Sequence, residues 1–279
     1  MGVITAPIFY VHTYLYKSYK EYMSKVTDRL DNQNIVNLAK QNYEKQQRSK
    51  VPGYLVTLPS KGKIYPAASP LRSGQVEMRY MTAYDEDILS NASYIKAGTV
   101  LNKLVDSLLL TDGVSVDDIG NSDLEALLIA ARIHAYGKMY PVIVTNNNQS
   151  LEKQVDLSKI PYREFNLISD ENGEFEYQTV NSGDVIKFKY LTTKEANAIQ
   201  EDQPVSGLLR AVIRSVNGNR DRSHIEEFVK FNFLAADARA FREYLVDNMY
   251  GLDFNMEFED ENGSIFQSRF RIGPELLWV

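Results

Sequence analysis

The sequence predicts an α+β fold built from two related units, and three observations support this prediction. The chain has 279 residues, 44% of them hydrophobic and 24% charged, so it can bury one large core or two small ones. Short alternating strands, apolar helical segments and a long β-hairpin follow one another in that order. The same order of landmarks then occurs a second time at an almost constant distance along the chain.

Two pairs of landmarks define the repeat. A strand ends near Tyr80 or Tyr190, and a threonine and acidic residues that open a helix follow. A later helix ends on Tyr-Gly, at Tyr136 or Tyr250, and a hairpin follows. The offsets are 190 − 80 = 110 and 250 − 136 = 114, so about four inserted residues align the copies. The predicted parts are a helical arm (1–50), a first unit (51–161), a linker with a hairpin (162–184) and a second unit with a C-terminal anchoring segment (185–279).

Composition excludes several classes of protein. Lys and Arg number 31 against 37 Asp and Glu, and the net charge of −6 argues against a protein that coats nucleic acid. No apolar run is long enough to cross a bilayer. We expect no secretory signal, because Pro7 interrupts the apolar start and a polar segment follows it. The absence of cysteine removes disulfides, thiol nucleophiles and cysteine zinc sites, and it fits a reducing compartment.

The N-terminal arm is predicted to be a long helix with a narrow apolar stripe. Residues 14–50 contain no proline or glycine, and apolar side chains recur every three to five residues. The stripe contains Tyr16, Tyr19, Met23, Val26 and Leu30. Such a thin stripe buries little surface within its own chain. The arm therefore either lies on the domain as a solvated helix or is buried against another subunit.

The first unit begins with two predicted short strands about a Lys61-Gly62 turn, because glycine tolerates the positive φ of a tight hairpin. Residues 75–81 alternate as a strand. Thr82, with Asp85 and Glu86 after it, predicts a helix N-cap.

A buried helix is predicted over 100–110. Ser122 with Glu125 predicts a capping box for a helix that Gly137 ends. A hairpin is expected over 139–157.

The second unit follows the same plan. Two strands are predicted over 174–180 and 185–191, and helices over 192–200 and 205–216. One or two helices then precede the final hairpin. The sequence Asp-Glu-Asn-Gly occurs at 170–173 and at 260–263, and it predicts hairpin turns because it lacks the further ligand positions of a calcium loop.

No arrangement of residues typical of catalysis is visible. His12, His134 and His224 lack a second histidine or a cysteine at ligand spacing, and none of the common hydrolase, metalloprotease or nucleotide-binding motifs occurs. Asp85 and Glu86 favour a capping role over a catalytic pair. We therefore expect no enzymatic activity, no cofactor and no catalytic or metal-binding residues.

Surface contacts are the remaining function class. Arg220 and Arg222 lie in a loop beside glycine, where they can hold an anion or the carboxylates of a partner. Trp278, the only tryptophan, is expected to anchor the C-terminus to a neighbour or to its own domain. Together with the arm stripe, the predicted partner-binding residues are Lys61, Lys63, Tyr65, Arg220, Arg222, Leu277 and Trp278.

Five segments in order resemble the baseplate-hub family of T4-type contractile-tailed bacteriophages. They are LPSKGKIYP, QVEMRYMTAYDEDIL, LLIAARIHAYG, FLAADARAFREYL and GPELLWV. The resemblance runs from about Leu58 to Val279, and the order of the segments carries it. Relatives carry a cysteine pair in each hairpin turn. Residues 145–149 and 260–263 contain no cysteine, so the resemblance implies no metal site in this chain. The arm has no counterpart in the family.

The resemblance implies a structural component of the baseplate hub region that acts through protein–protein contacts in tail assembly. The implied partners are other baseplate, hub, tape-measure or tail-tube proteins, with several copies in a symmetric assembly. The expected location is the virion tail baseplate, and the host cytoplasm during assembly. Two alternatives stay open: a transient assembly chaperone that is absent from the mature virion, and a hydrolase that uses exposed carboxylates such as Asp85 and Glu86.

Overall fold

The computed structural model describes residues 51–146, 149–199, 204–260 and 262–278. From Pro52 onward the described residues form one compact unit of helices and small antiparallel sheets, so the predicted α+β class is confirmed. The arm residues Tyr16, Tyr19, Met23, Val26 and Leu30 lie outside the described residues. Among the helices that are described, none is both long and apolar enough to pass through a bilayer.

The chain first forms an antiparallel pair, β1 (Gly53–Thr57) and β2 (Gln75–Arg79). The predicted hairpin about Lys61 and Gly62 is wrong. Both residues do adopt positive φ, 51° and 77°, but residues 63–69 after them form turns and not a strand. The N–H of Leu58 donates to the carbonyl of Gly74, so pairing continues toward β2 and the intervening residues form turns and the short helix η1 (Pro70–Ser73).

Four helices and a 3-10 turn follow, and α5 is the longest. They are α2 (Ala83–Leu89), α3 (Ala92–Lys96), α4 (Val100–Leu108), η2 (Val116–Asp118) and α5 (Asn121–Tyr136). The helices predicted after Thr82, over 100–110 and up to Gly137 are confirmed. The predicted capping box of Ser122 and Glu125 is wrong, because Gly120 is the N-cap and Ser122 already lies inside the helix. The third helical residue, Asp123, is buried instead.

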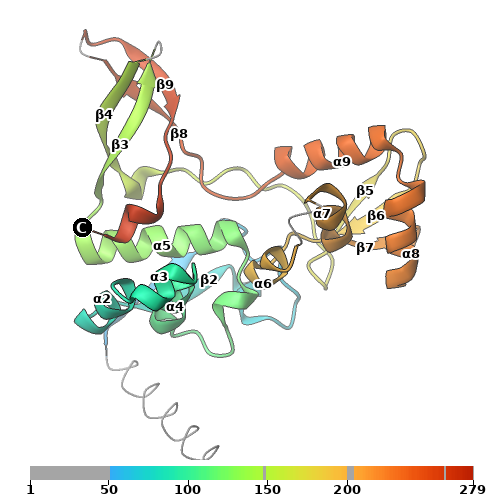
Figure 1. The fold of residues 1–279 in the computed structure, drawn as a ribbon, viewed down its shortest axis with the longest axis horizontal. Helices are drawn as coiled ribbons and strands as arrows, with labels where there is room; N and C mark the ends of the chain where they lie inside the picture. The colour runs from blue at the N-terminus through green and yellow to red at the C-terminus, as the bar shows by residue number, and fades with distance from the viewer. Residues whose placement is uncertain (1–50, 147–148, 200–203, 261, 279) are drawn as a thin grey trace, which may run out of the picture. The chain divides into compact units, whose positions relative to one another are not determined.

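Two β-hairpins stand side by side next to α5 (Figure 1). The first joins β3 (Met139–Asn146) to β4 (Gln149–Asp156) and leads into η3 (Leu157–Lys159), and the second joins β8 (Asn255–Glu259) to β9 (Ile265–Arg269). Both were predicted and are confirmed. They contact each other where the N–H of Thr145 donates to Ser268 Oγ at 3.3 Å and Ser268 Oγ donates to the carbonyl of Thr145 at 3.2 Å.

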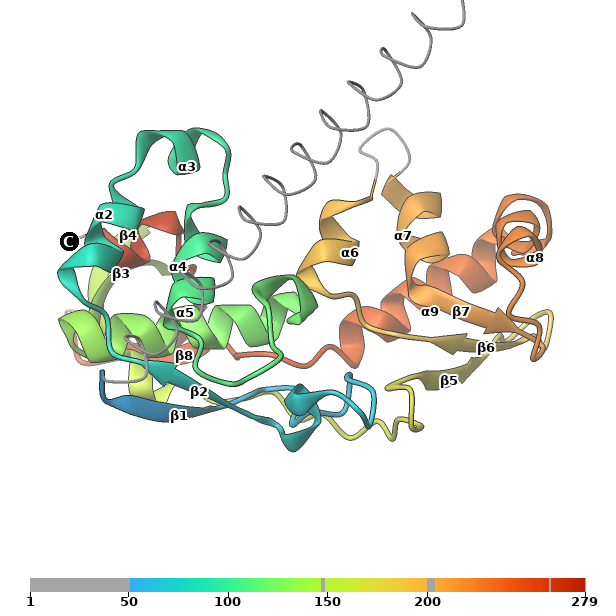
Figure 2. The ribbon, with the colours of Figure 1, turned by 90° about the horizontal axis from the view of Figure 1, so that it is seen from below.

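The remaining elements surround a three-stranded antiparallel sheet in the order β5-β6-β7 (Figure 2). The strands are β5 (Phe175–Gln178), β6 (Val185–Phe188) and β7 (Ile213–Val216), and the helices are α6 (Thr193–Asn197), α7 (Pro204–Val212), α8 (Arg222–Glu227), η4 (Phe228–Asn232) and α9 (Ala235–Asp247). The helix predicted over 205–216 is wrong in its last turn. Ile213 and Val216 are buried where β7 pairs with β6, so pairing overrides the helical pattern.

An aromatic cluster forms the centre of the core. Phe165 packs on Phe175, Tyr190 and Tyr250 with ring centroids 5.5–5.8 Å apart, and Phe188 packs on Phe175 and Tyr190. Phe165 comes from the segment predicted as a linker, and it is almost fully buried. Rings in such edge-on and tilted contacts stabilise a fold beyond the area they bury. The cluster therefore packs this segment into the core.

Candidate interaction surface

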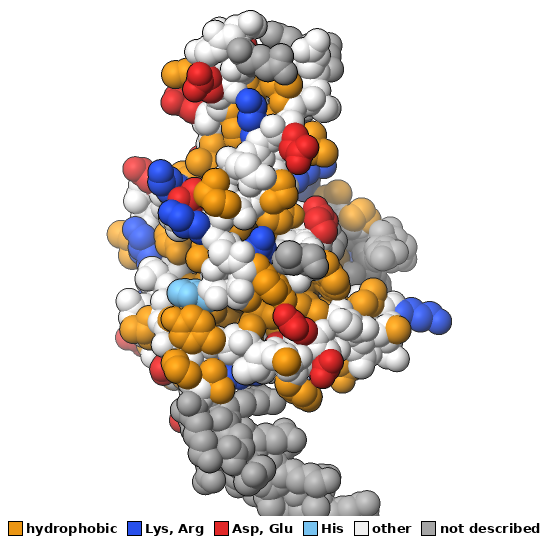
Figure 3. Space-filling view, turned by 90° about the vertical axis from the view of Figure 1, so that its left-hand side faces the viewer, with side chains coloured by type: hydrophobic (Ala, Val, Ile, Leu, Met, Phe, Trp, Pro, Cys, Tyr) orange, Lys and Arg blue, Asp and Glu red, His pale blue; other side chains and the backbone are white. Residues whose placement is uncertain are grey.

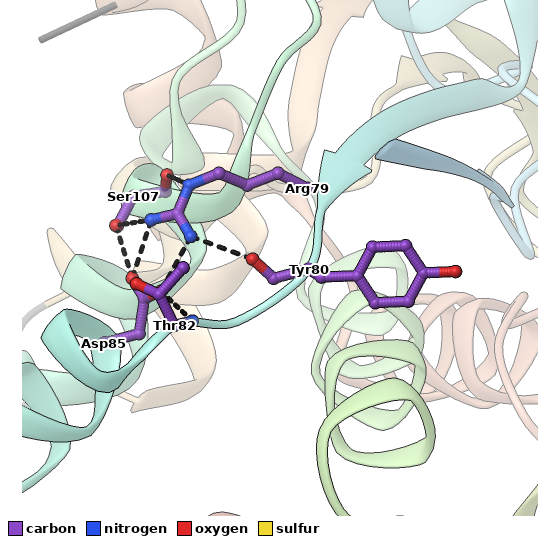
Figure 4. Close-up of polar contacts among 5 residues, drawn as sticks. All are labelled: Arg79, Tyr80, Thr82, Asp85 and Ser107. Atoms are coloured by element: carbon purple, nitrogen blue, oxygen red, sulfur yellow. Dashed lines mark hydrogen bonds and ion pairs between the residues drawn. The ribbon is translucent and has the colours of Figure 1, made fainter. Parts of the chain in front are cut away.

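A buried ion pair fixes the end of β2 against α2 and α4 (Figure 4). Arg79 donates from Nη1 and Nη2 to the two carboxylate oxygens of Asp85, both at 2.7 Å. Ser107 Oγ and the N–H of Thr82 also donate to this carboxylate, at 2.7 and 2.8 Å. Burial alone would raise the pKa of Asp85, but these hydrogen bonds outweigh burial and lower the pKa.

Asp85 is therefore an interior carboxylate at a helix start. It is fully buried, and the N–H of Thr82 is satisfied by its side chain, as predicted for a cap. The hydrolase alternative required Asp85 to be exposed, which it is not. Glu86 is exposed and accepts a hydrogen bond from the hydroxyl of Tyr136 at 3.2 Å.

The ion pair also determines where the next residue points. Arg79 turns toward α4, while Tyr80 projects away from it (Figure 4). The Tyr80 ring meets His134 of α5 at 5.2 Å and Tyr54 of β1 at 5.1 Å, and Tyr54 lies 3.8 Å from His134. Burial lowers the pKa of His134, which keeps the imidazole neutral at pH 7. The Tyr54 hydroxyl is buried and has no hydrogen-bond partner among the described residues.

Further aromatic side chains gather around α2. Tyr84 of α2 is 65% exposed, and Trp278 is 38% exposed while its Nε1 donates to the carbonyl of Leu89 at 3.2 Å. The aromatic face consists of Tyr80, Tyr84, His134, Tyr136 and Trp278. Figure 3 shows hydrophobic side chains collected on this side of the molecule, below the hairpins. Large exposed apolar patches of this kind are typical of protein–protein contacts.

The C-terminal segment is anchored to its own domain. Leu276 and Leu277 are buried in the short helix η5 (Pro274–Leu277), and Trp278 reaches the end of α2. Of the two alternatives for Trp278, the structure therefore shows the intramolecular anchor. Leu277 is buried, whereas Trp278 is exposed.

The Lys61–Tyr65 turn also serves the interior. Tyr65 is buried, and its hydroxyl donates to Asp123 Oδ2 at 2.6 Å while it accepts the N–H of Gly120 at 3.0 Å. Lys63 Nζ donates to the carbonyl of Phe165 at 2.8 Å. Lys61 is exposed. A partner-binding role for Lys61, Lys63 and Tyr65 stays a prediction.

The two loop arginines are held by neighbours in the chain. Arg220 forms a bidentate pair with Glu174, whose side chain is nearly buried. Arg222 donates to the carbonyl of Arg210 at 2.6 Å and lies 3.4 Å from Glu226. Both arginines remain half exposed. These bonds therefore leave room for a partner, and the predicted contact stays a prediction.

The turn of the second hairpin is held by hydrogen bonds. In the second hairpin, Asp260 Oδ1 accepts the N–H groups of Asn262 and Ser264 at 2.8 and 2.9 Å, which closes the turn by hydrogen bonds. The chain has no cysteine to supply thiolate ligands. Within the described ranges, no group of three or more acidic, histidine or cysteine side chains is placed to bind a metal.

Comparison with known proteins gives one family. Neither the curated proteins nor the solved structures give a match to the chain. The model of the family described as T4 bacteriophage base plate protein matches residues 51–262, from the start of β1 through the turn of the last hairpin. Because this match spans well over half of the sequence, the chain belongs to the T4 bacteriophage base plate protein family and has a structural role in the phage baseplate.

Proposed function

We propose that the chain is a non-enzymatic building block of the hub region of a contractile-tail baseplate, held in several copies by protein–protein contacts. The observation that carries this proposal is the aromatic face around α2. Tyr80, Tyr84, His134 and Trp278 are exposed. The Arg79–Asp85 pair next to Tyr80 and the bond from Trp278 to Leu89 hold two of these side chains in place. Exposed aromatic side chains in a fixed geometry are what a permanent contact requires, because little side-chain freedom is lost on binding.

The partners proposed are other baseplate, hub, tape-measure or tail-tube proteins, and not nucleic acid. The net charge of −6 disfavours a phosphate backbone. We place the chain in the virion tail, with assembly in the host cytoplasm. The arm belongs to the same proposal: removal of residues 1–50 is expected to prevent incorporation into tails while the rest of the chain stays folded.

The proposal includes two copies of one structural unit, residues 51–161 and 185–279. Thr82 and Thr192 each precede a helix whose third residue, Asp85 or Glu195, accepts a hydrogen bond from the threonine N–H. The third residues of α5 and α9, Asp123 and Asp237, are both buried and both bind the backbone of an earlier turn. Such agreement between distant residues supports a duplicated unit.

The decisive experiment measures incorporation of a variant into tails. Tyr84→Glu places a charge on the aromatic face, and Ile168→Glu places the same charge on an exposed apolar residue outside it. We expect Tyr84→Glu to lower the copy number in purified virions, measured by quantitative mass spectrometry, at least tenfold. Ile168→Glu is expected to leave the copy number unchanged.

Two outcomes would contradict the proposal. Equal incorporation of both variants would remove the aromatic face from assembly. Absence of the unaltered chain from purified virions, together with its presence in assembly intermediates, would favour the transient chaperone.

A further inference from the structure

Three arginines converge on one pocket beside the first turns of α5. The pocket has a volume of about 500 Å³. Arg163, Arg269 and Arg271 line it, with Glu125 of α5 as its one acidic residue. Leu252 contributes buried apolar surface. The three guanidinium groups and one carboxylate give the lining a formal charge of +2, in a chain whose net charge is −6.

Backbone pairing places these arginines. Phe270 donates its N–H to the carbonyl of Phe254, which extends the pairing of the second hairpin past Arg269. Side chains alternate along a strand, so burial of Phe270 in the core directs Arg269 and Arg271 to the opposite side. Arg163 is fixed from another direction, because its N–H donates to the carbonyl of Gly251 at 2.9 Å.

The arginine side chains are not used inside the fold. Within the part of the chain that the structure describes, no hydrogen bond or ion pair involves the guanidinium groups of Arg163, Arg269 or Arg271. By contrast, Arg79 and Arg220 each form a bidentate pair with a carboxylate. Arginines that converge without a close partner retain their capacity for planar, bidentate binding.

Glu125 indicates which kind of anion fits. Its carboxyl group lies near Arg163 and Arg269, whose charges act on it, and burial raises its pKa. The pocket thus already accommodates one carboxylate within the field of two arginines. The remaining charge fits a second carboxylate, whereas a long polyanion would meet the acidic surface of the chain.

We propose that this pocket binds an acidic segment of a partner protein, with Arg269 and Arg271 pairing with its carboxylate groups. This inference rests on the proposed function, since it names the chemistry of one baseplate contact. It differs from the aromatic face in location and in the kind of bond. Arginine–carboxylate pairs orient a partner as well as hold it, which suits an assembly with a fixed register.

The test uses the purified full chain and two labelled peptides, hexaglutamate and hexaglutamine, at low salt. We expect hexaglutamate to bind at least tenfold more tightly in fluorescence anisotropy. The double variant Arg269→Gln/Arg271→Gln is expected to lose at least tenfold in affinity for hexaglutamate. The matched control, Arg239→Gln/Arg242→Gln, removes the same charge from α9 outside the pocket and is expected to change the affinity less than twofold.

A variant that is expected to bind hexaglutamate more tightly shows that the loss of affinity in the double variant does not come from unfolding. Glu125→Gln removes the resident carboxylate, so hexaglutamate is expected to bind severalfold more tightly. Equal losses in the pocket variant and the control would overturn the proposal, as would equal binding of the two peptides. Tighter, pocket-dependent binding of a short single-stranded oligonucleotide would overturn it in favour of nucleic acid. Failure here together with reduced incorporation of the Tyr84 variant into virions would count against the pocket alone. Success here together with normal incorporation of that variant would count against the aromatic face alone.

Discussion

Asp123 and Asp237 are both buried near the start of a helix, α5 or α9, yet their pKa values shift in opposite directions. Each is the third residue of its helix, and the offset of 237 − 123 = 114 equals that between Tyr136 and Tyr250. Each accepts a backbone N–H from an earlier turn at 2.9 Å, from Ser60 in one case and from Asn181 in the other. The two carboxylates thus hold comparable turns.

Their remaining partners differ. Asp123 accepts hydrogen bonds from the hydroxyls of Ser60 and Tyr65, both at 2.6 Å, and burial raises its pKa to about 6 in spite of them. Burial also disfavours the ionised form of Asp237. Two backbone N–H groups and the side-chain amide of Asn181 outweigh it, and the pKa is lowered. The helix position therefore fixes the contact, while the donors around each carboxylate decide the direction of its pKa shift.

A second pair of acidic residues, each third in its helix, differs in ion pairing. Asp85 and Glu195 each bind the N–H of the threonine before their helix, and their offset is 195 − 85 = 110. Asp85 and its partner Arg79 are fully enclosed, whereas Glu195 and Arg214 are partly exposed. Solvent screens the second pair and not the first.

The largest effect is expected for Asp85→Ala. The substitution leaves Arg79 as an unpaired charge inside the protein, which costs about 3–5 kcal/mol of the free energy of unfolding. The matched variant Glu195→Ala removes an exposed carboxylate from Arg214 and is expected to cost less than about 1 kcal/mol. Urea unfolding followed by circular dichroism measures both. Equal losses would show that the two junctions are buried alike.

Asp123→Asn is expected to stabilise the protein above pH 6. The folded form of Asp123 binds its proton more tightly than the unfolded form, whose pKa is near 4. The free energy of unfolding therefore falls as the pH rises from about 4 to about 6, by about 3 kcal/mol for a shift of this size. Asparagine does not ionise, so the free energy of unfolding of the variant is expected not to show this decrease with pH. Urea midpoints measured between pH 4 and pH 8 test it.

Asp237→Asn is the control for that experiment, and its expected effect on the free energy of unfolding has the opposite sign. A lowered pKa stabilises the fold above pH 4, and this contribution disappears as the pH falls through the folded pKa. The variant is expected to be less stable than the wild type at pH 7 and to lose this dependence below pH 4. If both asparagine variants shifted stability in the same direction at pH 7, the contrast between the two halves would be wrong.

A smaller effect than that of Asp85→Ala is expected for Tyr65→Phe. Its hydroxyl donates to Asp123 and accepts from Gly120, so its loss leaves a buried N–H and a buried carboxylate each short of one partner. We expect a cost of about 1–3 kcal/mol at pH 8. Tyr190→Phe removes a hydroxyl that donates only to the carbonyl of Asn248, and about 1 kcal/mol is expected. Thermal unfolding at matched pH compares them; a larger loss for Tyr190→Phe would contradict the assignment.

Local patterns predicted most of the elements because they depend on neighbouring residues. The helices after Thr82 and before Gly137, and both long hairpins, follow from caps, glycine and alternation. Pairing of β1 with β2 and the strand β7 depend on partners distant in sequence, so no local pattern indicated them.

Of the sites, Trp278 could be recognised as an anchor, but its target at Leu89 could not. The alternation of Arg269, Phe270 and Arg271 was a usable signal for the pocket, whereas nothing near Arg163 indicated that it faces the same space.

The two Asp-Glu-Asn-Gly turns show which features follow from the local sequence and which arise only from the tertiary structure. The sequence alone determined their geometry: Asp170 and Asp260 each accept two N–H groups of their own turn, and Gly173 and Gly263 take φ of 74° and 82°. The tertiary structure decided their surroundings. A Cβ on Gly173 would lie 2.5 Å from the carbonyl oxygen of Ile64, whereas the nearest atom to one on Gly263 is a glutamate side-chain oxygen at 3.6 Å. Turn geometry is set by hydrogen bonds among four or five adjacent residues, but burial, charge state and partner surfaces arise only when distant segments meet.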